Sequence, residues 1–169
     1  MYAYGQEKTE PEEGSLWAVN VFSAEHGFIS WGEGEVLGEV MVPLAQPRPV
    51  INELPDTGQK WDEQFGFQLQ CLDGEDKGLE VVYKGTSMGY KQMFNTIMQA
   101  VQNQLSAGST EVIPVVTLDT DSYRHKAYGT VFKPQLNVHK WVAASEEAPE
   151  VDDIDPDETP KKSSRRKRA

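Results

Sequence analysis

The regular alternation of apolar and polar residues is the feature that most constrains how this chain can fold. In residues 61–72 (WDEQFGFQLQCL), Phe65, Phe67, Leu69 and Cys71 fall on one face of an extended backbone. This period of two is typical of a strand that buries one side. The same pattern predicts strands at 16–22, 61–72, 79–85, 112–118 and 130–142. Two more strands are predicted within 28–44; they follow a turn at His26-Gly27 and are broken by Gly32 and Gly34. Residues 45–60 are predicted to be a loop, and residues 119–129 a loop or hairpin tip.

One stretch departs from this period. Ser87 can cap a helix, and Gly108 can end it. Between them the apolar residues recur at spacings of three and four, which predicts an amphipathic helix. Several strands, one helix and two further strands suit a mainly β fold, which we expect to be an OB-like small β-barrel with one helix. An open α+β sheet is the alternative. The apolar positions of the helix are Tyr90, Met93, Phe94, Ile97, Met98, Val101 and Leu105.

The two ends of the chain differ in composition from the strand-rich part. The first fourteen residues are polar and rich in Glu, and the pattern typical of a core stops after Ala144. Such segments bury too little apolar surface to fold by themselves. We therefore expect a disordered segment at 1–14, one β-barrel domain at 15–142, and a disordered tail at 143–169, acidic over 146–158 and basic over 161–168.

The net charge of −11 is unevenly distributed along the chain. Residues 15–83 carry a net charge of −9, whereas residues 84–142 carry +3. Binding to nucleic acid depends on Lys and Arg near phosphates. An acidic chain with this distribution can still present one basic face, so the overall charge does not exclude a nucleic-acid partner.

No motif of a known catalytic site occurs in the sequence. The chain has no GxSxG, no GxGxxG and no phosphate-binding loop with GKS or GKT. His26, His125 and His139 form no closely spaced ligand pair. We therefore expect a protein that is not an enzyme and that uses no cofactor and no metal ion.

Cysteine content and hydropathy indicate the compartment. Cys71 is the only cysteine, so an internal disulfide is excluded, and its place in an alternating run predicts a buried thiol. No apolar run approaches the roughly 18–20 residues that cross a bilayer. The first residues lack the basic and apolar regions of a signal peptide. We expect a protein of the reducing cytoplasm, without a membrane partner.

Residues 123–128 (YRHKAY) are the leading candidate for a binding site. Two tyrosines, an arginine, a histidine and a lysine stand within six positions. Single-stranded nucleic acids stack their bases on aromatic rings and place their phosphates near cations. Strand-like alternation here would put Tyr123 and His125 on one face and Arg124, Lys126 and Tyr128 on the other. A solvated hairpin without a ligand is the alternative.

Other residues could widen this site. Residues 84–91 place two lysines and two hydroxyl groups before a helix start, where free N–H groups favour phosphate. An ordinary helix cap explains the same residues without a ligand. Trp31 could serve as a stacking platform, or it could belong to the core. The residues predicted to contact nucleic acid besides the 123–128 group are Lys84, Tyr90, Lys91, Lys133, Lys140 and Trp31.

The combination of a strand-rich core at 15–142, the mixed Tyr/Arg/His/Lys loop at 123–128 and the acidic run at 146–158 resembles bacteriophage single-stranded DNA-binding proteins. The resemblance is one of architecture and composition. It implies an OB-type barrel that binds single-stranded DNA without sequence preference in phage replication, recombination or repair, in the host cell cytoplasm. It also implies that the tail recruits replication or recombination proteins. The basic block at 161–168 departs from the acidic, aromatic-ended tails of several such proteins.

Two further classes of function remain open. The net charge of −9 over residues 15–83 also fits an acidic protein-interaction module, such as a DNA mimic that occupies the basic cleft of a host protein. A structural protein that forms homo-oligomers is compatible with the sequence as well.

Overall fold

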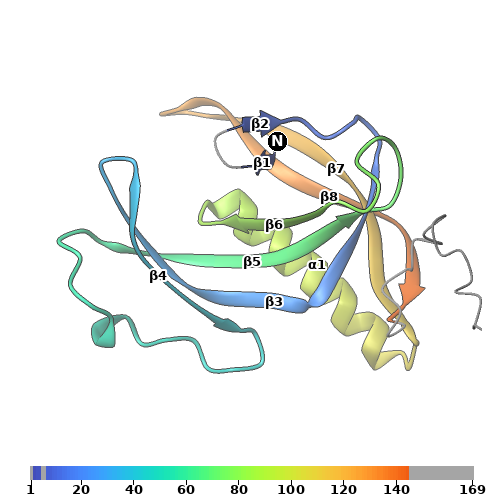
Figure 1. Cartoon of the computed structure of the whole chain (residues 1–169), viewed down its shortest axis with the longest axis horizontal. Helices are drawn as coiled ribbons and strands as arrows, with labels where there is room; N and C mark the ends of the chain where they lie inside the picture. The colour runs from blue at the N-terminus through green and yellow to red at the C-terminus, as the bar shows by residue number, and fades with distance from the viewer. Residues whose placement is uncertain (1, 5–6, 145–169) are drawn as a thin grey trace, which may run out of the picture.

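A long, bent strand organises the fold in the computed structural model, which describes residues 2–4 and 7–144. This strand, β3 (Leu16–Gly32), pairs along one edge with β5 (Trp61–Cys71). Its other edge is shared by β7 (Glu111–His125) and β4 (Glu35–Pro43), each on a different half of β3. With β6 (Glu80–Gly85) and β8 (Gly129–Ala143) the strand order is β6-β5-β3-β7-β8, all antiparallel (Figure 1).

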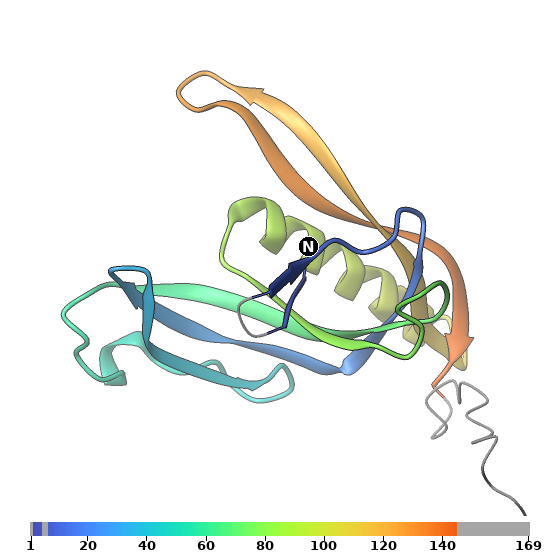
Figure 2. The same cartoon turned by 45° about the horizontal axis from the view of Figure 1, so that its top comes forward.

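The sheet is open. Strands β6 and β8 lie at the two ends of this order, and within the described part of the chain they do not pair with each other; β4, which pairs with β3 alone, is a further edge strand. The prediction of a mainly β protein with one helix is confirmed in its open-sheet alternative, and the closed OB-like barrel is not formed. The physical reason is the course of β7 and β8, whose outer halves extend away from the sheet so that β8 does not reach β6 (Figure 2).

A bulge bends β3 near its middle. Asn20 pairs with Gln68 and Glu25 with Gly66, so the four residues 21–24 of β3 stand opposite the single residue Phe67 of β5. Ser23 holds this bulge: its hydroxyl donates to the Asn20 carbonyl (2.6 Å) and accepts the Gln68 N–H (2.8 Å). The bend lets the two halves of β3 face different partner strands.

The turn predicted at His26-Gly27 is wrong, because both residues lie inside β3. Gly27 is needed there for a different reason. A Cβ atom at this position would overlap the carbonyl oxygen of Val40 on the adjacent strand β4. The turn occurs instead at Glu33-Gly34, where both residues have a positive φ (53° and 82°), as in a two-residue type I′ hairpin.

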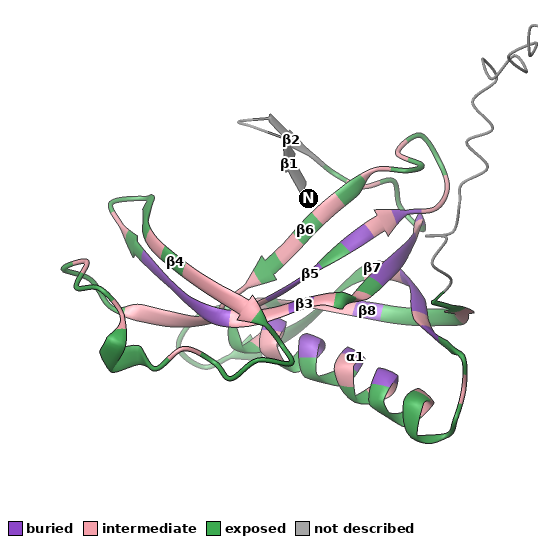
Figure 3. Ribbon diagram, turned by 60° about the horizontal axis from the view of Figure 1, so that its bottom comes forward, coloured by how far each residue is buried: buried purple, intermediate pink, exposed green. Residues whose placement is uncertain are grey.

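The helix α1 (Met88–Ser106) begins where the sequence predicts. Ser87 accepts the N–H of Tyr90 at 3.1 Å as its N-cap. The predicted apolar stripe faces the sheet (Figure 3), where the Phe94 ring packs against Phe65 and Phe67 with centroid distances of 4.9 and 5.6 Å. The core lies between α1 and the sheet, and besides these rings it contains Trp17, Val19, Leu69, Cys71, Tyr90, Met93, Ile97, Val116 and Leu136.

The thiol of Cys71 is fully buried, as predicted. Burial raises the pKa of this thiol, and the S–H group donates to the carbonyl of Asp73 at 3.1 Å. Burial keeps the sulfur in its neutral form, so Cys71 is a packing residue of the core.

Two segments outside the sheet complete the described chain. Between β4 and β5, residues 44–60 form the predicted loop, with a short 3₁₀ turn at Ile51–Glu53. Within the N-terminal segment expected to lack structure, β1 (Tyr2–Tyr4) and β2 (Glu7–Thr9) pair as a small hairpin. The tail predicted to be disordered lies outside the described residues from 145 onward. No helix in the described part of the chain is both long and apolar enough to cross a bilayer.

Candidate nucleic-acid interface

The outer part of the β7–β8 hairpin, residues 119–135, forms an arm that extends from the body (Figure 2). Strand pairing continues through this segment, with Tyr123 opposite Val131 and His125 opposite Gly129. Of the two predictions for residues 119–129, the hairpin tip is the one the structure contains. Polar side chains are tolerated in these strands because almost the whole outer arm is exposed to solvent.

The arm turns through Lys126, Ala127 and Tyr128. Gly129, which follows, has a φ of +72°, the left-handed conformation that a three-residue hairpin loop requires and that glycine adopts without strain. The N–H of Ala127 donates to Nδ1 of His125 at 3.0 Å. The ring of Tyr128 stacks on that of His125 with centroids 4.8 Å apart and planes 28° apart. The turn is therefore fixed by a hydrogen bond and a ring stack.

This stack changes the predicted distribution of side chains. Alternation placed Tyr128 with Arg124 and Lys126, but the turn interrupts the alternation and brings its ring onto His125 instead. Tyr128 is 80% exposed and Tyr123 is 47% exposed. Two aromatic rings are thus presented to solvent within one turn of the chain.

The cations of the tip form no ion pair with an acidic residue of the described chain. Neither Arg124 nor Lys126 makes an ion pair within the part of the chain that the structure describes. Five of the predicted site residues therefore share one small exposed region, which combines aromatic rings with cations that form no ion pair among the described residues. They are Tyr123, Arg124, His125, Lys126 and Tyr128, and together they are called the arm tip below.

Phe132 is an aromatic residue of the arm that was not predicted to belong to the site. It is 70% exposed and lies opposite Ser122 on β7. Cross-strand partners share a face of the sheet, so Phe132 lies on the same face as Arg124, which is paired with Thr130. The segment TVFK predicts only a strand. The exposure of Phe132 depends on how far the arm extends beyond the core, which the sequence does not indicate.

A hollow of about 400 Å³ lies between the root of the arm and the start of α1. It brings together three of the other predicted residues, Lys84, Tyr90 and Lys133, with Phe132 beside them. Both lysines are already paired: Lys84 Nζ lies 2.9 Å from Glu39, and Lys133 Nζ lies 3.7 Å from Asp121. They offer less positive charge to a phosphate than the arm tip does.

The Lys84–Glu39 pair also affects the pKa of Glu39. Burial disfavours the charged carboxylate, but hydrogen bonds from Lys84 and from Gln64 outweigh it and lower the pKa of Glu39. The carboxylate therefore stays ionised at neutral pH and keeps Lys84 engaged.

The remaining predicted residues do not join the arm tip. Tyr90 is 3% exposed and donates its hydroxyl to the Tyr83 carbonyl at 2.6 Å, so it cannot stack on a base. Lys91 pairs with Glu63 at 3.4 Å, and the same carboxylate contacts Arg48. Trp31 is half exposed at the end of the β3–β4 hairpin, and Lys140 lies near the base of β8, opposite Val115.

Neither a metal site nor a known relative indicates a function for the arm tip. Among residues 2–4 and 7–144, no group of three His, Cys, Asp or Glu side chains has the arrangement of a metal site. No known protein family, no curated protein and no solved structure matches this chain.

Proposed function

We propose that this protein binds single-stranded DNA without sequence preference through its arm tip and Phe132. The observation that supports this most is that three exposed rings and two cations lie on the same arm. The rings are Tyr123, Tyr128 and Phe132, and the cations, Arg124 and Lys126, have no acidic partner among the described residues. Each base stacked on an aromatic side chain contributes about 1–3 kcal/mol to binding. Arg124 and Lys126 would neutralise the adjoining phosphates.

The arm suits a single strand better than a folded partner. Its exposed rings, Tyr123, Tyr128 and Phe132, come from different positions of a narrow hairpin. Unpaired bases offer free faces on which such rings can stack, whereas the bases of a duplex are already stacked on one another. The same proposal includes a role in phage DNA replication, recombination or repair in the host cytoplasm. In it, the acidic run at 146–158 competes for the arm tip and recruits replication or recombination proteins.

The test is fluorescence-anisotropy binding of the full chain to labelled oligo-dT and to matched duplex at low salt. We expect tighter binding to the single strand. Tyr128→Ala should weaken it about 5- to 150-fold, which corresponds to the stacking contribution. Arg124→Ala should weaken it as well.

Two control variants separate the arm tip from general surface effects. Phe22 is an exposed ring (74%) in the β3 bulge, and Lys77 is a cation in the turn between β5 and β6. Phe22→Ala and Lys77→Ala should bind like the wild type. Equal affinity of Tyr128→Ala and the wild type would contradict the proposed site. Absence of binding to either oligonucleotide would contradict the function and favour the acidic interaction module.

A further inference from the structure

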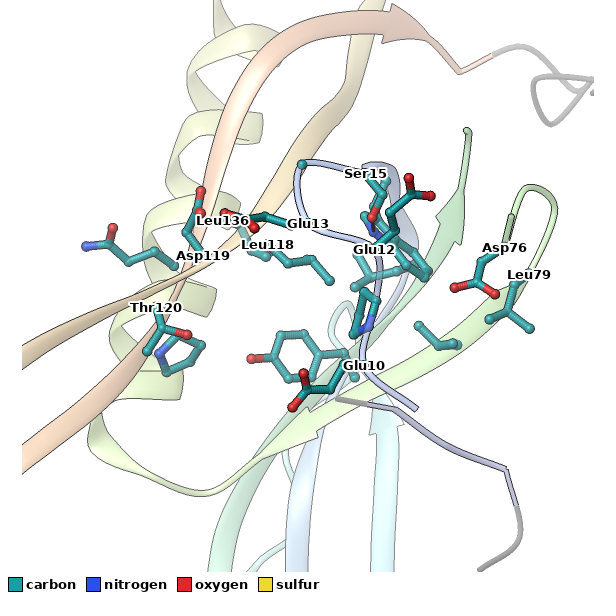
Figure 4. Close-up of a pocket in the computed structure, with 18 of the residues that line it drawn as sticks. Glu10, Glu12, Glu13, Ser15, Asp76, Leu79, Leu118, Asp119, Thr120 and Leu136 are labelled. Atoms are coloured by element: carbon teal, nitrogen blue, oxygen red, sulfur yellow. Dashed lines mark hydrogen bonds between the residues drawn. The ribbon is translucent and has the colours of Figure 1, made fainter. Parts of the chain in front are cut away.

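A second hollow lies on the open side of the sheet and has a different chemical character. It has a volume of about 1100 Å³ and lies between the edge strand β6 and the root of the arm (Figure 4). Residues 79–84 line one side of it, residues 118–120 and 134–136 the other, and the segment 10–15 crosses it. We call it the acidic cleft.

Carboxylates dominate its charge. Among the residues that the structure describes, Lys84 is the one basic residue that lines it, and that lysine is already paired with Glu39. Like charges gathered in one partly enclosed space repel one another, and a cationic partner removes that repulsion. The acidic residues that line the cleft are Glu10, Glu12, Glu13, Asp76, Glu80 and Asp119.

Some of these carboxylates have hydrogen bonds of their own. Asp119 accepts from Thr117 and Asn137, and Glu12 accepts the N–H of Glu75. Glu10, Glu13 and Glu80 accept no hydrogen bond and form no ion pair among the described residues, and all three are exposed. Their charge is available to a partner.

The cleft also has an apolar floor. Leu79, Val81 and Leu118 are only partly buried there, beside the core residues Trp17 and Leu136. Long Lys and Arg side chains bury their aliphatic stems on apolar surface while their charged ends stay at a polar rim. A floor of this kind below a carboxylate rim is therefore suited to a basic peptide rather than to free cations.

We propose that the acidic cleft is the docking site of this chain's own basic block, residues 161–168. The block carries six Lys and Arg residues in eight positions, and residues 145–169 follow directly on the end of β8. This proposal does not depend on DNA binding at the arm tip, which shares no residue with the cleft.

The chain is long enough for this contact. Residues 145–160 separate the block from the described part of the chain, and sixteen extended residues span up to about 50 Å. Leu136, on the cleft wall, lies only seven residues before the end of β8, about 24 Å along the strand. Because the block is tethered, its effective concentration at the cleft is of millimolar order.

The experiment places a spin label on the full chain at Ser164→Cys and records amide NMR signals. Cys71 is fully buried and stays unlabelled. We expect paramagnetic broadening concentrated on residues 79–84, 118–120 and 134–136. The triple variant Glu10→Gln, Glu13→Gln, Glu80→Gln should abolish this broadening. The matched control Glu33→Gln, Glu35→Gln, Glu53→Gln changes the net charge equally, lies outside the cleft and should retain the broadening.

Several outcomes would overturn the proposal. These are broadening that is absent from the cleft, broadening spread evenly over the surface, and broadening that survives the triple cleft variant. Either of the first two would place the block elsewhere, for instance on the acidic run at 146–158, and the third would show that the cleft carboxylates do not hold it. If the cleft variant is poorly folded, replacing Lys161, Lys162, Arg165 and Arg166 by Gln tests the same contact from the other side and should also remove the broadening.

Discussion

Tyr90 shows how burial converts a residue that resembles a ligand-binding ring into part of the core. Its side chain is buried against Phe94 and Tyr83, and its hydroxyl donates to the Tyr83 carbonyl. Burial, with a smaller contribution from Tyr83, raises the pKa of Tyr90 far above that of a free tyrosine. Ionisation of the Tyr90 phenol is therefore coupled to unfolding.

This shift predicts an alkaline loss of stability. The unfolded chain can ionise Tyr90 above about pH 10, whereas the folded chain resists ionisation, so the stability contributed by the neutral phenol is present below that pH and declines above it. Tyr83, whose pKa burial also raises, acts in the same direction. Urea unfolding between pH 8 and about pH 11 should show a smaller decline for Tyr90→Phe than for the wild type, together with a loss of about 1 kcal/mol near neutral pH. Parallel pH profiles for the two proteins would contradict this assignment.

At the scale of single elements, α1 depends on its first turn. Ser87 satisfies the N–H of Tyr90, one of the backbone groups that a helix start leaves without a partner. Ser87→Ala should lower the free energy of unfolding by about 1 kcal/mol in urea titrations, and Ser87→Asn should restore most of it. If Ser87→Asn is as unstable as Ser87→Ala, the hydroxyl is not acting as a cap.

The elements that the sequence predicts well are those that bury one face. Helix α1 and strand β5 follow their apolar periods closely, because Phe94 and Phe67 must both reach the core. The arm could not be predicted in the same way. The strand predicted at 130–142 covers β8, but the outer half of β7 carries exposed side chains and is held by backbone hydrogen bonds, so no apolar period marks it.

The candidate site was predictable as a composition but not as a geometry. The density of rings and cations at 123–128 identified the arm tip. The ion pairs of Lys84 and Lys133 depend on contacts far apart in the sequence, and so does the burial of Tyr90. The continuity of β3 through His26-Gly27 likewise depends on the neighbouring strand β4.

At the scale of the whole molecule, binding and stability should be separable. Tyr128 lies at the end of the arm, whereas Phe94 stacks on Phe65 and Phe67 in the core. Phe94→Ala should destabilise the protein by about 3–5 kcal/mol. Tyr128→Ala should leave the unfolding midpoint within about 0.5 kcal/mol of wild type while reducing DNA affinity. A large loss of stability in Tyr128→Ala would show that the arm is part of the cooperative core.

The salt dependence of binding reports how many cations the whole surface uses. If Arg124 and Lys126 alone neutralise phosphates, the log–log slope of affinity against salt should be about −1.4 for a single strand. Arg124→Ala should bring the slope to about −0.7. A wild-type slope near −2.8 would show that two more cations, such as Lys84 and Lys133, leave their carboxylate partners to join the interface.

The shared edge of β3 has a consequence for how such a protein can diversify. Because β4 and β7 occupy separate halves of that edge, the β3–β4 and β7–β8 hairpins are attached to one strand without pairing with each other. Insertions or deletions at either hairpin end would leave the register of the other unchanged. The fold is thus a scaffold on which the length of one projection can evolve while the other keeps its form.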